Sequence, residues 1–215
     1  MEKSAAGVEV TGPTIPTQPP DHRLHDHDDR SAVVAIDQHT LVQLLRRNAV
    51  VFQVGFALLW SLRFMAAAGM PQLPLVVAVG GALVVRAAFR STRGLSARTS
   101  FRTPDGKQFL RPVTVMTLVQ IAASVILPAV AGAVGADEWA IPIVAVTIGL
   151  FLVGLARSVG VRAVCYVGIE ATIVPLALPF LASGDTLVAL TSANMMVALT
   201  VSAIGCARVA AGDQR

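Results

Sequence analysis

Apolar residues along this chain fall into six long runs that shorter polar segments separate. Each run has about 20 residues, which is the length that an α-helix needs to cross the hydrocarbon core of a bilayer. Lipid offers the backbone no hydrogen-bond partner, so each run is predicted to be a helix. The strict polar and apolar alternation of a lipid-facing barrel strand is absent from the sequence. The runs cover residues 49–68, 73–89, 113–134, 139–156, 164–182 and 186–209.

The composition points to the same class of protein. Of the 215 residues, 54% are hydrophobic and only 14% are charged. A soluble domain has roughly a quarter of its residues charged, so this chain cannot cover a water-facing surface. The predicted fold is therefore all-α: a polytopic integral membrane protein with six transmembrane helices in a bundle.

The loops between the runs alternate in charge. The connections at 69–72, 135–138 and 183–185 contain no Lys or Arg, and two of them carry acids. Every other connection, and both ends of the chain, carry Arg or Lys. The positive-inside rule then places both termini in the cytoplasm, in a multi-pass protein of the cell (inner or plasma) membrane.

The most basic stretch is RAAFRSTRGLSARTSFRTPDGKQFLR, residues 86–111. It is predicted to be the second cytoplasmic loop, with its arginines reaching anionic lipid headgroups. Gly94 and the Pro104–Gly106 triplet supply turn signals there. A nucleic-acid surface would interleave basic residues with stacking aromatics, and this stretch contains few aromatics, so no nucleic-acid partner is predicted. The candidate lipid-contacting residues are Arg86, Arg90, Arg93 and Arg98.

Four segments divide the chain. Residues 1–30 are Pro/Thr-rich and then charged, which predicts a disordered cytoplasmic tail. Residues 31–48 form a partly amphipathic segment that is expected to lie at the membrane interface, with an unstructured lead-in at its start as the alternative. Residues 49–209 are the six-helix domain, and 210–215 form a second cytoplasmic tail. The histidines all precede the first run and match no zinc-site spacing, so no metal site is predicted.

Glu170 is the clearest candidate for a functional group inside the membrane. It lies in the fifth run, about 9 Å from its cytoplasmic start at 1.5 Å per residue. Tyr166 is one helical turn earlier on the same face, and Pro175 follows in the same run. An ionisable group at that depth is expensive. It is interpreted either as an ion- or proton-coupling site or as a neutral or arginine-paired structural group.

Arg63 and Asn194 complete the candidate intramembrane polar site. Arg63 lies about 8 Å from the outer end of the first run. It is expected either to extend outward to the acidic loops or to pair with Glu170 across an axial offset of about 12 Å. Asn194, like Gln53 and Gln120, is expected to form interhelical hydrogen bonds or to line a substrate path.

No motif in the sequence names a reaction. After His39 no histidine occurs, and no aspartate lies inside a run, which disfavours an intramembrane catalytic pair or metal centre. No enzyme activity and no cofactor are predicted. Two function classes remain: a small transport or permeation protein built on the intramembrane carboxylate, or a non-catalytic membrane scaffold or regulatory partner. Either class is compatible with a homo-oligomer. In general character the chain resembles small bacterial integral membrane proteins.

Overall fold

The computed structural model describes residues 23–93, 101 and 104–212, with side chains from residue 38 onward except that of residue 105. Residues up to Ala35 form a unit of their own, and Ile36–Arg215 form a second unit that contains the helical bundle. Most of the predicted tail, residues 1–22, and Arg98 lie outside the described residues.

The described chain is helical, as predicted. Within it, six helices are long and apolar enough to cross a membrane, so the all-α class is confirmed and the helices are compatible with a multi-pass membrane protein. A 3₁₀ turn at Asp137–Trp139 precedes α5, and another at Leu178–Phe180 follows α6. The helices are α1 (Arg23–Ala68), α2 (Leu73–Ser91), α4 (Pro104–Ala133), α5 (Ala140–Val159), α6 (Arg162–Ala177) and α7 (Gly184–Gly212).

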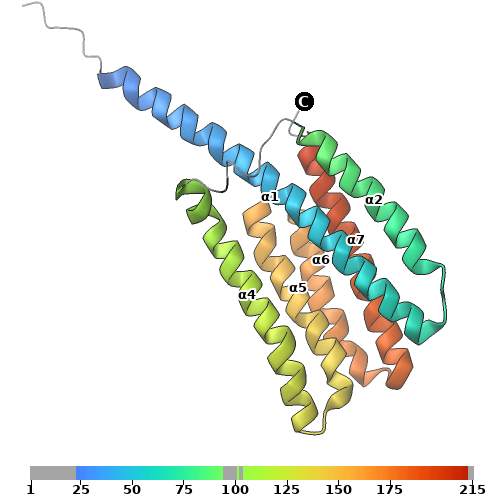
Figure 1. Ribbon diagram of the computed structural model, residues 1–215. Coiled ribbons are helices and arrows are strands. Elements are labelled where there is room, and N and C mark those ends of the chain that lie inside the picture. Colours follow the sequence, from blue (N-terminus) through green and yellow to red (C-terminus); the bar gives the residue numbers. More distant parts are fainter. Residues whose placement is uncertain (1–22, 94–100, 102–103, 213–215) are drawn as a thin grey trace, which may run out of the picture. The chain divides into compact units, whose positions relative to one another are not determined.

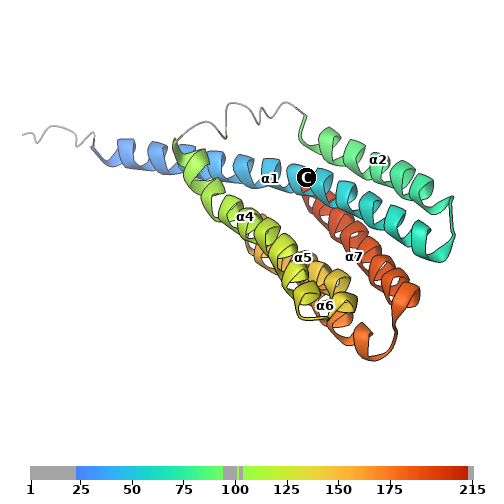
Figure 2. The same ribbon diagram turned by 60° about the horizontal axis from the view of Figure 1, so that its bottom comes forward.

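Consecutive helices of the bundle run in opposite directions (Figures 1 and 2). α5 packs against α4, α6 and α7, and α7 also contacts α6 and α2. From α1, the stretch after residue 40 packs into this group through one face, on which buried residues recur every three or four positions. The buried residues of α1 include Leu41, Leu44, Leu45, Ala49, Val50, Gln53, Ala57 and Trp60.

α2 and α4 are peripheral. They expose large apolar side chains along most of their length; Leu75 of α2 is 68% exposed and Leu118 of α4 is 63% exposed. Patches of this extent are rare on soluble monomers, whereas acyl chains cover them without cost. The periphery of the bundle therefore fits a lipid environment.

α5 and α6 pack closely against each other in the core. A two-residue link joins them, in which Gly160 takes a left-handed conformation (φ 66°) that ends α5. Farther along, Gly149 and Gly168 let the two backbones meet. A Cβ on Gly168 would lie 2.7 Å from the Val153 nitrogen and 2.9 Å from the Gly149 oxygen, so only glycine fits there.

Candidate functional site

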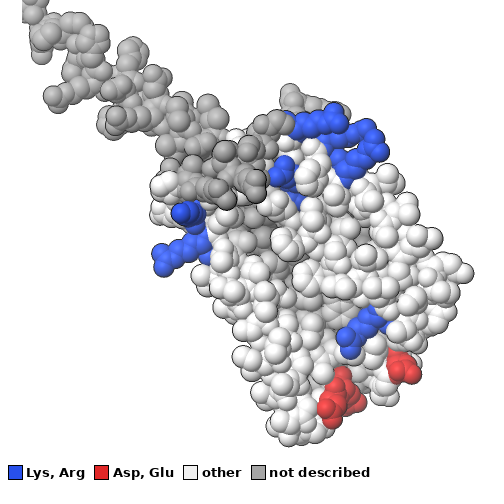
Figure 3. Space-filling view, in the orientation of Figure 1, with Lys and Arg blue, Asp and Glu red and all other residues white. Residues whose placement is uncertain are grey.

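Charge is divided between the two ends of the bundle. In Figure 3 most Lys and Arg side chains gather at one end and the acidic side chains at the other. The cationic end comprises the last turns of α2, α5 and α7 and the first turns of α4 and α6. The acidic end carries Asp137, Glu138 and Asp185. Of the predicted lipid-contacting arginines, Arg86, Arg90 and Arg93 are exposed at the cationic end.

Arg46 and Arg47 of α1 contact other helices inside the cationic end. Arg46 is only 8% exposed, and its Nε donates a hydrogen bond of 2.7 Å to the backbone carbonyl of Val159, the last residue of α5. Arg47 lies over the ring of Phe89 at 4.8 Å from its centre, and its Nη1 is 3.5 Å from Thr92 Oγ1. The two arginines thus tie α1 to the ends of α5 and α2. Sequence reasoning missed this because consecutive arginines after an amphipathic segment are typical of an interface.

Glu170 and Tyr166 both face away from the bundle. The buried face of α6 carries Val164, Gly168, Ala171 and Pro175, and Glu170 and Tyr166 lie on the opposite side, one turn apart. Tyr166 is 71% exposed, and Glu170 is exposed as well. Within the described chain Glu170 forms no hydrogen bond or ion pair. The candidate carboxylate therefore points outward.

Arg63 and Asn194 are not brought together with Glu170. Arg63 is exposed on the part of α1 that lies towards the acidic end of the bundle. It borders a cavity of about 350 Å³ between α1, α4 and α5. Asn194 lies on α7 with its Nδ2 buried and without a hydrogen-bond partner. No hydrogen bond or ion pair among the described residues links these three side chains.

Other polar side chains are buried inside the bundle. Thr191, Ser192 and Ser202 of α7 are fully buried, and their hydroxyl oxygens have no partner in the described structure. Gln53 of α1 is 3% exposed, and both its amide atoms are buried without a hydrogen-bond partner in the described structure. Its amide lies beside the thiol of Cys206 on α7, a weak donor and acceptor.

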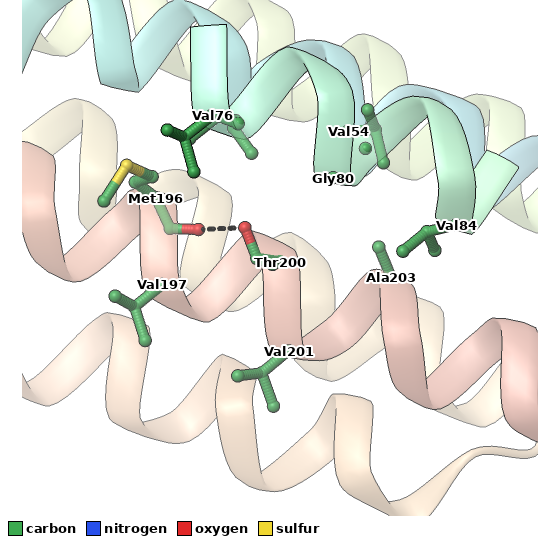
Figure 4. A pocket seen from close by; sticks show the side chains of 12 residues that line it. Val54, Val76, Gly80, Val84, Met196, Val197, Thr200, Val201 and Ala203 are labelled. Carbon is green, nitrogen blue, oxygen red and sulfur yellow. Dashed lines mark hydrogen bonds between the residues drawn. The ribbon is translucent and has the colours of Figure 1, made fainter. Parts of the chain in front are cut away.

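Two further cavities flank α1. One, of about 340 Å³, lies between α1, α2 and α7 (Figure 4). Its one hydroxyl, Thr200 Oγ1, donates to the carbonyl of Met196 in its own helix at 2.8 Å, so the hydroxyl hydrogen is already used within α7. The other, of about 280 Å³, lies between α1, α4, α5 and α7, and Gln53 is in its wall.

Comparison with known proteins gives no relative: no protein-family model, curated protein or solved structure matches this chain.

Proposed function

We propose that this chain is a non-catalytic membrane protein that works by assembling with other membrane-embedded chains, and that a second copy docks on the outward face of α6. The observation that carries the proposal is the position of Glu170, exposed on that face with Tyr166 one turn away. A transport role would favour a carboxylate that faces a path through the bundle. The outward direction of Glu170 favours assembly instead.

The cost of a carboxylate in lipid supplies the driving force. An ionised side chain at the centre of a transmembrane helix costs about 3 kcal/mol on insertion scales. Polar groups on such a helix lower this cost by hydrogen bonding to a neighbouring helix. A partner on α6 would cover Glu170, so the isolated chain is the less favourable state.

A second copy suits this face because the face is self-complementary. Tyr166 carries a hydroxyl donor, and Glu170 carries an acceptor one helical turn away. A two-fold axis along the membrane normal places the two copies of this patch face to face at the same depth. The Tyr166 side chain of each copy would then extend along one helical turn, about 6 Å, to reach the Glu170 carboxylate of the other copy. The same patch then serves both subunits, as an isologous interface requires.

We place the cationic end of the bundle on the cytoplasmic side of the cell membrane, with both termini inside, because arginines concentrate in cytoplasmic loops. In a background of Cys165→Ala and Cys206→Ala, a membrane-impermeant maleimide is expected to label Asp185→Cys in sealed right-side-out vesicles. Arg162→Cys is expected to react only after permeabilisation. Equal labelling of both variants, or the reverse order, would overturn the orientation.

Glu170→Leu and Tyr166→Phe are each expected to weaken the dimer. Each change removes two symmetric hydrogen bonds, and a bond between transmembrane helices contributes about 0.6 kcal/mol and at most about 1.7 kcal/mol. The dimer should therefore dissociate at protein densities roughly tenfold or more above the wild-type value. Single-molecule photobleaching across a series of protein-to-lipid ratios measures this.

Leu118→Ala on α4 is the matched control, because it changes an equally lipid-exposed side chain on another helix. It should leave the dimer unchanged. A monomeric wild type, or a dimer that resists both α6 variants, would contradict the proposal. The transport class is tested in the same vesicles: a proton- or ion-driven flux that Glu170→Gln abolishes while the dimer persists would support transport in its place.

A further inference from the structure

Arg63 is a cation without a counter-charge on an otherwise apolar part of α1. It lies within the apolar segment Gln38–Ala68, about 8 Å from the end of the helix at 1.5 Å per residue. Asp137, Glu138 and Asp185 lie at the same end of the bundle (Figure 3). Even so, the Arg63 guanidinium forms no ion pair or hydrogen bond among the residues that the structure describes. A charge within a membrane-spanning segment is unfavourable unless a partner meets it, so an anion that reaches Arg63 would be stabilised.

The side chain of Arg63 also borders a cavity. This cavity has a volume of about 350 Å³ and lies between α1, α4 and α5. Small-molecule sites have volumes of about 300–1,000 Å³ and combine a mostly apolar wall with a few placed polar groups. Apart from Arg63 and Ser124, the wall here is made of aromatic, aliphatic and proline side chains, among them Trp60 of α1 and Ile141 of α5. No acidic side chain is among its lining residues.

The hydroxyl of Ser124, the other polar group in this wall, is already bonded on both sides. Thr147 Oγ1 donates to the Val144 carbonyl at 2.8 Å, so the 2.8 Å bond between Ser124 and Thr147 uses the hydrogen of Ser124. Gln120 Nε2 lies 3.5 Å from Ser124 Oγ as a second donor. Arg63, with five N–H donors, is therefore the charged group left to select a ligand.

The cavity can be reached from the lipid side. Phe56 and Leu59 of α1 are in its wall and are 38% and 60% exposed. Arg63 itself is exposed at the same rim. A cation at one place on an apolar wall matches an amphiphile that has an anionic head group and a hydrocarbon chain. Such a molecule already resides in a bilayer and can reach the rim laterally.

We propose that this cavity binds an anionic lipid, whose hydrocarbon chain lies along the apolar wall and whose carboxylate or phosphate head group pairs with the Arg63 guanidinium. A guanidinium binds either anion through two parallel N–H···O bonds. The cavity of Figure 4 is an internal contrast: it is similarly apolar, but no charged side chain lines it, so it cannot select a head group. The inference does not depend on dimer formation through α6, because α6 contributes no residue to this wall.

The test uses the full chain in phosphatidylcholine nanodiscs and a palmitate that carries a photoreactive diazirine in its chain. The pH is alkaline, so that the carboxylate is ionised. Irradiation followed by peptide mass spectrometry is expected to place the label on the parts of α1, α4 and α5 that border the cavity. Unlabelled palmitate should displace the probe roughly tenfold better than hexadecanol, which has the same chain and a neutral head group.

Charge variants assign this preference to Arg63. In Arg63→Gln the difference between palmitate and hexadecanol should disappear. Arg157→Gln is the matched control, because Arg157 is also exposed but lies in the last turn of α5, outside the cavity wall. The preference for palmitate should persist in that variant.

A second arm distinguishes the two sources of the anion. Phosphatidylglycerol replaces part of the phosphatidylcholine, and palmitate labelling is measured relative to any labelling at the cavity of Figure 4. A fall in this ratio assigns the site to phospholipids that carry a net negative charge. An unchanged ratio, together with the preference for palmitate over hexadecanol, assigns the site to single-chain carboxylates.

Two tryptophan variants keep the test decisive if Arg63→Gln does not fold. Leu59→Trp narrows the rim and should lower the labelling, whereas Leu62→Trp, also exposed on α1 but outside the cavity wall, should not. Three results would overturn the proposal. These are equal displacement by palmitate and hexadecanol in the wild type, a preference for palmitate that survives in Arg63→Gln, and labelling spread evenly over lipid-facing helices.

Discussion

Gly168→Ala is expected to lower the free energy of unfolding by about 1–3 kcal/mol, the usual cost of overpacking a core. The added Cβ would lie 2.7 Å from the Val153 nitrogen and 2.9 Å from the Gly149 oxygen, both backbone atoms that cannot rotate away. α5 and α6 would have to separate, and their contact holds the centre of the bundle. Gly149→Ala should act in the same direction, since its Cβ would lie 2.7 Å from the backbone of Ala171 and Thr172.

The sign of the change in unfolding free energy distinguishes close packing from helix propensity as the dominant effect. Alanine is about 1 kcal/mol better than glycine inside a helix, so propensity alone predicts that both variants gain stability. Gly80→Ala on α2 is the control, because no atom lies within 4 Å of its added Cβ. SDS-induced unfolding in bicelles should show a loss for Gly168→Ala and no loss for Gly80→Ala. Equal behaviour of the two variants would refute the close contact of α5 and α6.

Arg46→Met is expected to destabilise the bundle by about 1.5–3 kcal/mol, the range for a hydrogen bond to a charged group. Methionine keeps most of the side-chain volume but leaves the Val159 carbonyl without its donor at the end of α5. That carbonyl belongs to the last turn of the helix, where no backbone partner exists. The positive charge beside this negative end of the helix dipole is lost as well.

Arg157→Met is the matched control, since Arg157 lies in the last turn of α5 and is exposed. In a Cys165→Ala background, thermal exposure of the buried Cys206 thiol to a fluorogenic maleimide reports unfolding of each variant. The melting temperature should fall for Arg46→Met and stay near the wild-type value for Arg157→Met. An unchanged or higher value for Arg46→Met would mean that desolvation of the guanidinium outweighs its bond.

The positions of the helices were predictable from the sequence. A helix that crosses a bilayer must be long and apolar, and both properties can be read from a run of apolar residues. The predicted run at 73–89 corresponds to α2, Leu73–Ser91, and the run at 186–209 lies within α7, Gly184–Gly212. One local signal was wrong: the Pro104–Gly106 triplet begins α4 and does not form a turn. Proline is well suited to a first helical position, where its missing N–H costs nothing.

The directions of side chains were not predictable. In water an amphipathic period marks the buried face, but in a membrane the surroundings are as apolar as the core. Leu118 of α4 is 63% exposed and Leu152 of α5 is 1% exposed, and nothing in the local sequence separates them. For the same reason the sequence identifies Gln53 and Glu170 as intramembrane polar residues but does not indicate which of them faces the core. The structure turns the first inward and the second outward.

The bond from Arg46 to Val159 spans 113 residues of sequence. At a synthesis rate of about 5–20 residues per second, Arg46 is synthesised roughly 6–23 s before its acceptor exists. During that interval the nascent chain lacks the bond between Arg46 and Val159. A product that stops short of α5 lacks the Val159 carbonyl, so its α1 is without the attachment that Arg46 makes to the end of α5 in the complete chain.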